Sequence, residues 1–233
     1  MSTVDGAETR DAGAPGDDEA EAARDAEESR LTAAQALYFY GVARARLWRG
    51  ARPGAGEEDV MRVRYRDMEA LVRTTTYDLP PLDEDRLLAH QRVLETAMRR
   101  GTVLPAPYGI VFRGRRQLIR MLQDQYVAID EGLSFLDGHW ELRLHIGARD
   151  ATESLAELAD LAMQLYSELR RHARAAVPFA ADEQRLVSAA FLVERAAWIE
   201  FIERSDDLGA AHPELVFDVT GPWPAYDFVR IVP

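Results

Sequence analysis

Cysteine and lysine are both absent from this chain of 233 residues, and all 28 of its basic residues are arginine. Without cysteine the chain can form no disulfide, no thiol nucleophile and no zinc–thiolate site. Without lysine it has neither the phosphate-binding lysine of a Walker motif nor a Schiff-base lysine. These absences exclude several classes of enzyme and of metal site.

Long apolar runs are missing as well. No stretch approaches the roughly 20 apolar residues that a membrane-spanning helix needs, and no signal peptide precedes the first predicted strand. We therefore expect a cytoplasmic protein without a membrane partner.

The charge is unevenly distributed. The formal net charge is −12, and residues 1–30 hold ten acidic residues and three arginines, so they carry −7 and the remaining chain −5. An acidic balance argues against nucleic acid, because its binders need a basic face to displace counterions. Residues 1–30 also have few large apolar side chains, which predicts a disordered, solvated tail. Docking of this tail through its charge is the alternative.

Hydrophobic periodicity predicts alternating strands and helices. Strands are predicted at 37–42, 61–66, 68–76, 103–112, 139–146, 186–193 and 215–219. Helices are predicted at 83–100, 115–136 and 195–209, with a further helix that starts with an Asp150–Glu153 capping box and ends at Pro178. Because 103–112 contains Pro105 and Pro107, this strand must be an edge, a bulge or a pair of bends.

This order of elements predicts an α+β protein made of two ferredoxin-like α/β sandwich domains in series. We assign residues 31–113 to the N-terminal domain and 114–233 to a modified C-terminal one, with the junction within 113–138. A C-terminal arm rich in proline and aromatic residues spans 220–233.

The positions of the histidines predict neither a catalytic site nor a metal site. In helix 83–100 the predicted apolar stripe is Leu87, Gln91, Leu94 and Met98, with Leu88 widening it, and His90 is expected at the surface or boundary. His139, Glu141, Arg143 and His145 share the polar face of a predicted strand. The two histidines lie roughly 20 Å apart, too far for one metal ion. A row of Arg62, Arg64 and Arg66 is either a solvated sheet face or a surface for an acidic partner.

No nucleophile is placed beside a base in any known catalytic motif. The carboxylates fall on predicted polar helix faces or in loops, where they serve solubility and helix-end electrostatics. We therefore predict no catalytic residue, no cofactor, no metal site and no enzymatic activity.

The arm carries the candidate binding site. Gly221 permits a sharp turn, and Pro222 and Pro224 stiffen the backbone. The predicted partner-binding residues are Trp223, Pro224, Tyr226 and Phe228. Two interpretations stay open: the arm plugs its own domain, or it offers Trp223 to a partner as an anchor. If the arm is extended, Tyr226 and Phe228 pack inward and Trp223 is the more exposed ring.

Five blocks in one order carry a family resemblance: residues 37–42, 103–112, 140–143, 190–193 and 215–228. Together they resemble the gas vesicle protein F/L family from Leu37 onward, with Tyr108 where Phe is commoner and Ala225 where Pro is commoner. The resemblance implies two ferredoxin-like domains and a non-enzymatic assembly factor or minor vesicle component. Its implied partners are the small hydrophobic shell protein and other gas vesicle accessory proteins, at the vesicle in the cytoplasm.

Two other functions compete with this interpretation. Paired ferredoxin-like domains also form ligand-sensing regulatory modules, which would need a pocket of convergent polar groups between the domains. An RNA-binding module would need aromatic and basic residues together on central strands, and Tyr38, Phe39 and Tyr40 have no basic neighbours.

Overall fold

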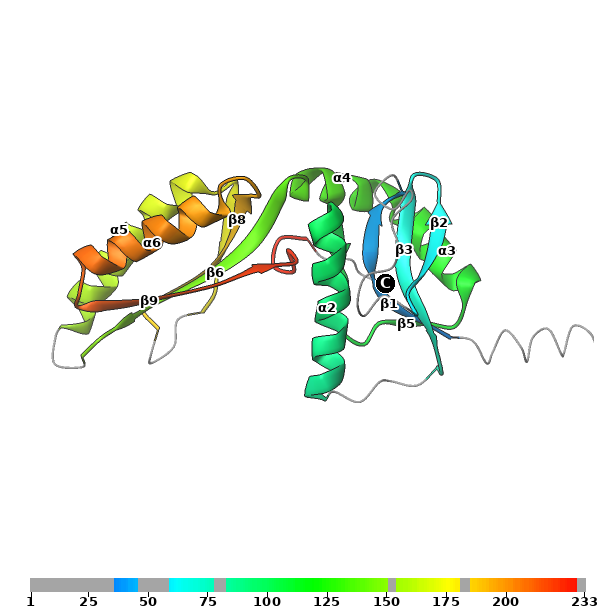
Figure 1. Ribbon diagram of the computed structural model, residues 1–233, viewed down its shortest axis with the longest axis horizontal. Helices are drawn as coiled ribbons and strands as arrows, with labels where there is room; N and C mark the ends of the chain where they lie inside the picture. Colours follow the sequence, from blue (N-terminus) through cyan, green and yellow to red (C-terminus); the bar gives the residue numbers. More distant parts are fainter. Residues whose placement is uncertain (1–35, 46–58, 78–82, 151–153, 181–184, 230–233) are drawn as a thin grey trace, which may run out of the picture.

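The computed structural model describes residues 36–45, 59–77, 83–150, 154–180 and 185–229. Two antiparallel sheets form two lobes side by side, and helix α2 stands between them (Figure 1). The predicted acidic tail 1–30 lies outside the described residues.

The N-terminal sheet is built around β1 (Ala36–Arg44) in the strand order β2-β3-β1-β4, with β5 also pairing with β1. The other strands are β2 (Met61–Tyr65), β3 (Met68–Thr75), β4 (Val103–Pro105) and β5 (Val111–Phe112). The proline-containing segment is therefore a pair of short strands, both antiparallel to β1. This is the pair of bends that the prolines allowed.

Helices cover both faces of this sheet. α2 (Glu84–Arg100) packs on one face in a cluster with Tyr38, Tyr40 and Leu71. α3 (Arg115–Asp124) and α4 (Tyr126–Leu136) cover the other face, in a cluster with Phe39, Val63 and Val72. Consecutive strand residues point to opposite faces, so both sets of β1 side chains are buried and the strand has no polar face.

Prediction of a single helix over 115–136 was wrong. The chain breaks at Gln125, whose φ of −103° and ψ of 14° depart from helical values. α3 then contacts β2 and β5, whereas α4 contacts β4 and β1. Each helix therefore covers a different part of the sheet. No glycine or proline marks the break between the two helices in the sequence.

The C-terminal sheet has the order β7-β8-β6-β9. Its strands are β6 (His139–Ala148), β7 (Ala175–Pro178), β8 (Val187–Glu194) and β9 (Leu215–Trp223). α5 (Leu155–Leu169) and α6 (Trp198–Ala211) pack on one face, with a short 3-10 helix, Arg170–His172, after α5. The β-α-β-β-α-β order is that of a ferredoxin-like fold, and the N-terminal sheet repeats its strand order. The predicted fold class is confirmed.

The predicted helix ending at Pro178 is corrected. α5 ends at Leu169, and β7 pairs with β8 along 175–178. The segment Ala175–Val177 favours helix by composition, but pairing with β8 overrides that weak preference. Proline is tolerated at the end of β7 because this is an edge strand. Ser154 occupies the N-cap position of α5 without a side-chain capping bond, and Glu153 of the predicted capping box lies outside the described residues.

The strand predicted at 215–219 is also longer than expected. β9 continues through Pro222 to Trp223, with an irregular register opposite Glu141 and Arg143. Pro222 fits because β9 is the other edge of the sheet. At Gly221 the φ is +122°, a value that favours glycine.

The predicted domain bounds stay a prediction. Since α3 and α4 both contact the N-terminal sheet, we propose that the junction lies after α4, at residues 137–138. Arg44 of β1 reinforces this contact: its guanidinium binds the carboxylate of Asp130 in α4 and donates to Ser134 Oγ at 3.1 Å.

Candidate partner-binding site

The C-terminal arm crosses from its own sheet into the other lobe. Ala225 is 5% exposed and belongs to the same core cluster as Phe39 and Leu118 of the N-terminal lobe. Phe228 and Val229 are partly buried against that cluster. The arm therefore fills the core of the other lobe, and the interpretation that it plugs its own domain is corrected.

The arm is not extended beyond Pro224, so the predicted parity of its rings was wrong. Residues 226–228 form a turn. Tyr226 packs against the cluster under α2, whereas Phe228 packs against the cluster under α3 and α4. Both rings still point into the protein, but onto opposite sides of the N-terminal sheet.

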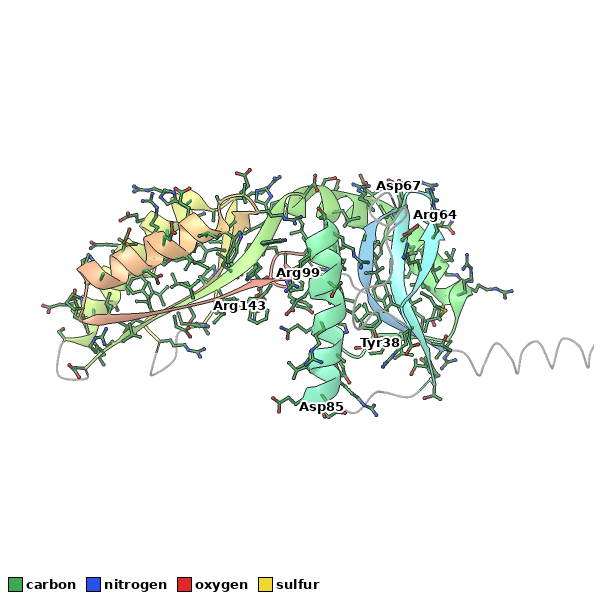
Figure 2. The ribbon with its side chains drawn as sticks, in the orientation of Figure 1. Tyr38, Arg64, Asp67, Asp85, Arg99 and Arg143 are labelled. Carbon is green, nitrogen blue, oxygen red and sulfur yellow. The ribbon has the colours of Figure 1, made fainter. Side chains whose placement is uncertain are left out.

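A buried carboxylate holds the arm in place. Glu141 of β6 has no exposed surface, and its Oε2 accepts the backbone N–H of Asp227 at 3.0 Å. Arg143 Nε donates to Glu141 Oε1 at 2.8 Å, and Arg143 Nη2 donates to Asp227 Oδ2 at 2.8 Å. Figure 2 places Arg143 near the end of β9, between the two lobes. One guanidinium thus serves two carboxylates, one from the sheet and one from the arm.

The electrostatics of this cluster follow from burial. Loss of solvent around Glu141, together with the nearby charge of Asp227, raises the pKa of its carboxyl to about 8, against the opposing effects of the Asp227 N–H and the charge of Arg143. Sequence reasoning placed Glu141 on a polar strand face beside His139 and Arg143 and missed its burial. Nothing local to β6 signals that the arm returns to cover it.

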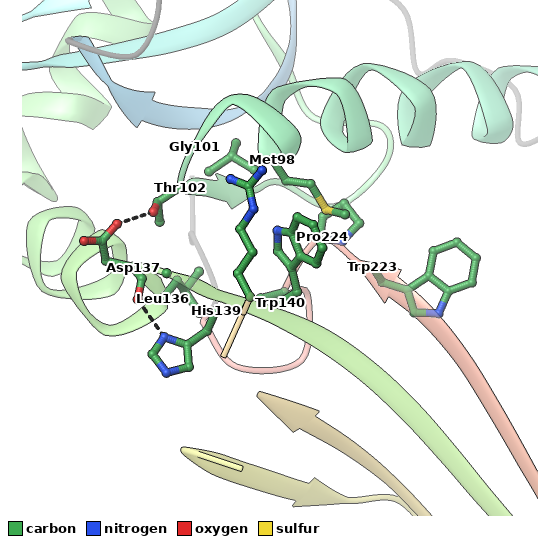
Figure 3. Close-up of a pocket in the computed structure, with 13 residues that line it drawn as sticks. Met98, Gly101, Thr102, Leu136, Asp137, His139, Trp140, Trp223 and Pro224 are labelled. Atoms are coloured by element: carbon green, nitrogen blue, oxygen red, sulfur yellow. Dashed lines mark hydrogen bonds between the residues drawn. The ribbon is translucent and has the colours of Figure 1, made fainter. Parts of the chain in front are cut away.

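A groove of about 150 Å³ lies at the junction of the lobes. Met98 at the end of α2, Leu136 at the end of α4, Trp140 of β6 and the Trp223–Pro224 segment supply its apolar walls. Figure 3 shows that these side chains come together from three separate parts of the chain. The domain junction and the arm thus make one composite apolar site.

Arg195 braces one wall of the groove. Its guanidinium carbon lies 4.8 Å from the centroid of the Trp140 ring, and its Nη2 donates to the backbone oxygen of Arg99 at 3.0 Å. A cation at the C-terminal end of α2 is favourable for the helix dipole. Thr102 Oγ1 donates to Asp137 Oδ1 at 2.5 Å across the same junction. These bonds fix the two lobes around the groove.

The four predicted binding residues take different positions. Pro224 is buried, and Tyr226 and Phe228 are partly buried in the two cores. Trp223 is partly exposed at the rim of the groove, with its ring directed away from Trp140 (Figure 3). Its indole N–H donates to Thr220 Oγ1 at 3.2 Å. Of the three rings, Trp223 is the one that packs against none of the three core clusters, and its binding role stays a prediction.

The predicted position of His90 at the surface or boundary was wrong. It is 3% exposed, its Nδ1 accepts from Tyr38 Oη at 2.8 Å, and its Nε2 donates to the backbone oxygen of Ala106 at 3.1 Å. Burial lowers the pKa of His90 to about 4. The predicted stripe was rotated: the buried residues of α2 are His90, Val93, Leu94, Ala97 and Met98. Leu87 and Leu88 are exposed.

The histidines of β6 have separate partners. His139 Nδ1 bonds the backbone oxygen of Asp137, and His145 Nδ1 bonds Ser188 Oγ. Within the described ranges, no group of three or more potential ligand side chains is arranged to hold a metal ion. Within the same ranges, no helix is both long and apolar enough to cross a membrane.

Comparison with known proteins finds one consistent family. The pattern of Gas vesicle synthesis protein GvpL/GvpF matches residues 36–160 and 143–230. Gas vesicle protein F1 of Halobacterium salinarum is 28% identical over 200 residues, with 84% of this chain and 93% of that protein covered. Gas vesicle protein L of a Streptomyces species is 28% identical over 203 residues, with 70% and 75% covered.

Solved structures agree on the fold. The crystal structure of GvpF from Anabaena sp. PCC7120 has a TM-score of 0.73 at 19% sequence identity, covering 85% of this chain and 98% of that one. GvpF from Microcystis aeruginosa has a TM-score of 0.69 at 17% identity, covering 83% and 98%. The two-lobed architecture is therefore shared with these proteins.

Proposed function

Because this chain belongs to the Gas vesicle synthesis protein GvpL/GvpF family and so has a gas-vesicle-related role, we propose that it is a non-enzymatic assembly factor or minor vesicle component. In this role it binds the small hydrophobic shell protein in the cytoplasm, with other gas vesicle accessory proteins as further partners.

The physical need for such a factor is general. A shell that excludes water must be built from subunits with a strongly apolar face. Exposed apolar patches of several hundred Å² promote aggregation, so these subunits need cover before they join the shell. A binding protein that offers a small, rigid apolar site can supply part of that cover.

One observation carries the proposal: the groove at the domain junction, with Trp223 at its rim. Trp is enriched among residues that dominate binding energy. The Glu141–Asp227 bond and the packing of Phe228 hold the arm, and with it Trp223, at low entropic cost for binding.

The test is capture of co-expressed shell protein by affinity-tagged full-length chain. We expect Trp223→Ala to weaken capture by about 2 kcal/mol, roughly 30-fold. Val216→Ala is the matched control, because Val216 lies on the same strand, is 41% exposed and does not line the groove. If Trp223→Ala retains wild-type capture, Trp223 is not the anchor. If the wild-type chain captures no shell protein, the proposed partner is wrong.

The alternative of a ligand-sensing module has less support. Small-molecule pockets usually enclose about 300–1,000 Å³ with a few convergent polar groups. This groove has about 150 Å³, and its walls are mostly apolar. We therefore prefer a protein side chain to a small metabolite as its occupant, and expect the purified protein to hydrolyse no nucleotide and to retain no stoichiometric metal.

A further inference from the structure

Helix α3 has one face packed on the sheet and one basic face that pairs with no carboxylate of the described residues. Leu118, Met121 and Leu122 are buried against the N-terminal core. On the opposite side Arg116 and Arg120 are exposed, and Arg113 and Arg115 are exposed at the start of the helix. We call these four residues the arginine face. Residues 113–120 contain no acidic residue, although the chain as a whole carries a net charge of −12.

The arginine face is unfavourable as it stands. Arg115 and Arg116 occupy the first turn of α3, which has no acidic residue and no side-chain cap, so positive charges adjoin the positive end of the helix dipole. Arg116 and Arg120 are one turn apart, and like charges at this spacing destabilise a helix by a few tenths of a kcal/mol. Arg113 lies 4.8 Å from the Tyr77 ring. In the described part of the chain, no carboxylate pairs with any of the four.

The topology brings the start of the folded chain to this face. Leu37 pairs with Phe112 in the β1–β5 ladder. Ala36 therefore lies at the end of the sheet where β5 leads into Arg113 and α3. The segment that precedes Ala36 carries a net charge of −7 over residues 1–30.

We propose that the acidic segment 17–28 is an intramolecular ligand of the arginine face and covers it against other anions. Seven acidic residues and one arginine fall between Asp17 and Glu28, so the charges are complementary. Seven residues lie between Glu28 and Ala36, and the eight residue-to-residue steps can span about 27 Å. This reach exceeds the roughly 15 Å length of a ten-residue helix. Tethering raises the effective concentration of the segment to the millimolar range. Such docking needs charge alone and no folded structure in the segment.

The experiment uses the full chain, which has no native cysteine. A nitroxide is attached at Ala20→Cys, and paramagnetic broadening of backbone amides is measured by NMR at 20 mM and 500 mM NaCl. We expect α3 amides to lose at least half their intensity at low salt and to recover at high salt, because exposed charges are screened over about a Debye length. The double variant Arg116→Gln/Arg120→Gln should abolish the broadening. So should a second variant in which the seven acidic residues of 17–28 are replaced by their amides.

Arg170→Gln/Arg171→Gln is the matched control, since these two arginines are adjacent and exposed in the other lobe; it should leave the broadening intact. Broadening of α3 that is equal in Arg116→Gln/Arg120→Gln would overturn the proposal. A mixing experiment tests for contact between two copies: chains that carry the nitroxide but no isotope label are mixed with isotope-labelled chains that carry no nitroxide. Equal broadening in this mixture would also overturn the proposal, because it would assign the contact to a second copy.

Heparin affinity chromatography gives a second measurement. Retention at low salt should rise when the seven acidic residues are replaced by their amides, and it should fall again when Arg116→Gln/Arg120→Gln is added. If adding Arg116→Gln/Arg120→Gln leaves heparin retention unchanged, the proposal is also contradicted.

Discussion

Glu141 and Asp227 lie 86 residues apart in the chain, yet the buried carboxylate of Glu141 accepts the backbone N–H of Asp227 at 3.0 Å. This bond joins the central strand of the C-terminal sheet to the arm that fills the N-terminal core. Burial disfavours the charged form of Glu141, so the stability of the folded protein should depend on pH.

We predict that Glu141→Gln reduces the pH dependence of stability. The pKa of Glu141 is raised from its ordinary value of 4.5 to about 8, so the folded protein holds a proton that the unfolded chain has released. Between these values stability falls as pH rises, with a limit of about 1.4 kcal/mol per pH unit. From pH 6.5 to 8.0 the wild type should lose about 1.6 kcal/mol relative to Glu141→Gln, measured by urea unfolding at both pH values.

Asp227→Asn provides the control for this effect. It removes the negative charge that helps to raise the pKa of Glu141, so its pH dependence should fall between those of the wild type and Glu141→Gln. His90 contributes little in this window, because its pKa is lowered to about 4 and its loss of stability occurs as pH falls below 6.5. Parallel pH curves for the wild type and Glu141→Gln would show that Glu141 does not titrate between pH 6.5 and 8.0.

Local pattern predicted much of the fold, but not the contacts between lobes. The N-cap at Asp83 accepts the N–H of Arg86 as its residue type predicts, and Gly138 ends α4 with a φ of +72°. In contrast, burial of Glu141 depends on an arm that returns from 86 residues away. Alternation in β6 places Glu141 on the polar face, and no local signal reveals that this face is covered at one end.

The same limit explains His90 and β7. The sequence of α2 is compatible with either Gln91 or His90 on the buried face. In the structure His90 is buried and bonds the hydroxyl of Tyr38, which lies 52 residues earlier in the chain. β7 is an alanine-rich segment that only its pairing with β8 makes a strand. For the site, sequence reasoning placed Tyr226 and Phe228 on one face, whereas the structure packs them on opposite sides of the N-terminal sheet, and the binding role of Trp223 stays a prediction.

The buried Tyr38–His90 bond should be measurable by a matched pair of substitutions. Tyr38→Phe leaves Nδ1 of buried His90 without its donor, which should cost about 1–3 kcal/mol in the free energy of unfolding. Tyr40→Phe removes a hydroxyl from the neighbouring ring, which stacks on His90 with centroids 5.4 Å apart, and should cost less than about 1 kcal/mol. Urea unfolding at pH 7 compares the two. If the two substitutions cost the same free energy of unfolding, the Tyr38–His90 hydrogen bond contributes no more than the hydroxyl of Tyr40.

Close approach of β1 and β4 predicts a severe effect of Gly41→Ala. A Cβ at Gly41 would lie 2.4 Å from the backbone oxygen of Leu104, so one of the two strands must move. We expect a loss of more than about 3 kcal/mol, or failure to fold. Gly109→Ala is the control: its φ of +95° disfavours alanine, but nothing lies within 4 Å of the added atom, so the cost should be near 1 kcal/mol. Thermal unfolding of both variants checks this. A Gly41→Ala protein as stable as Gly109→Ala would contradict the close approach.

The arm makes the last prediction, because its rings should separate stability from binding. Phe228 packs into the N-terminal core, so Phe228→Ala should cost about 2–4 kcal/mol, in the lower part of the range for buried aromatic residues because the ring is only partly buried. Tyr226→Ala should cost a similar amount, because Tyr226 packs against the cluster under α2. Trp223 belongs to neither core, and Trp223→Ala should cost less than about 1 kcal/mol.

Thermal unfolding and shell-protein capture, measured on each of these three alanine variants, give the comparison. Trp223→Ala should fold normally and capture poorly, whereas Phe228→Ala should lose stability first and should lose capture only as the arm detaches. Lower temperature tests this order, because it should restore capture by Phe228→Ala once the protein is folded but should not restore capture by Trp223→Ala. A Trp223→Ala protein that unfolds as readily as Phe228→Ala would make Trp223 a structural residue, and the groove would then need another anchor.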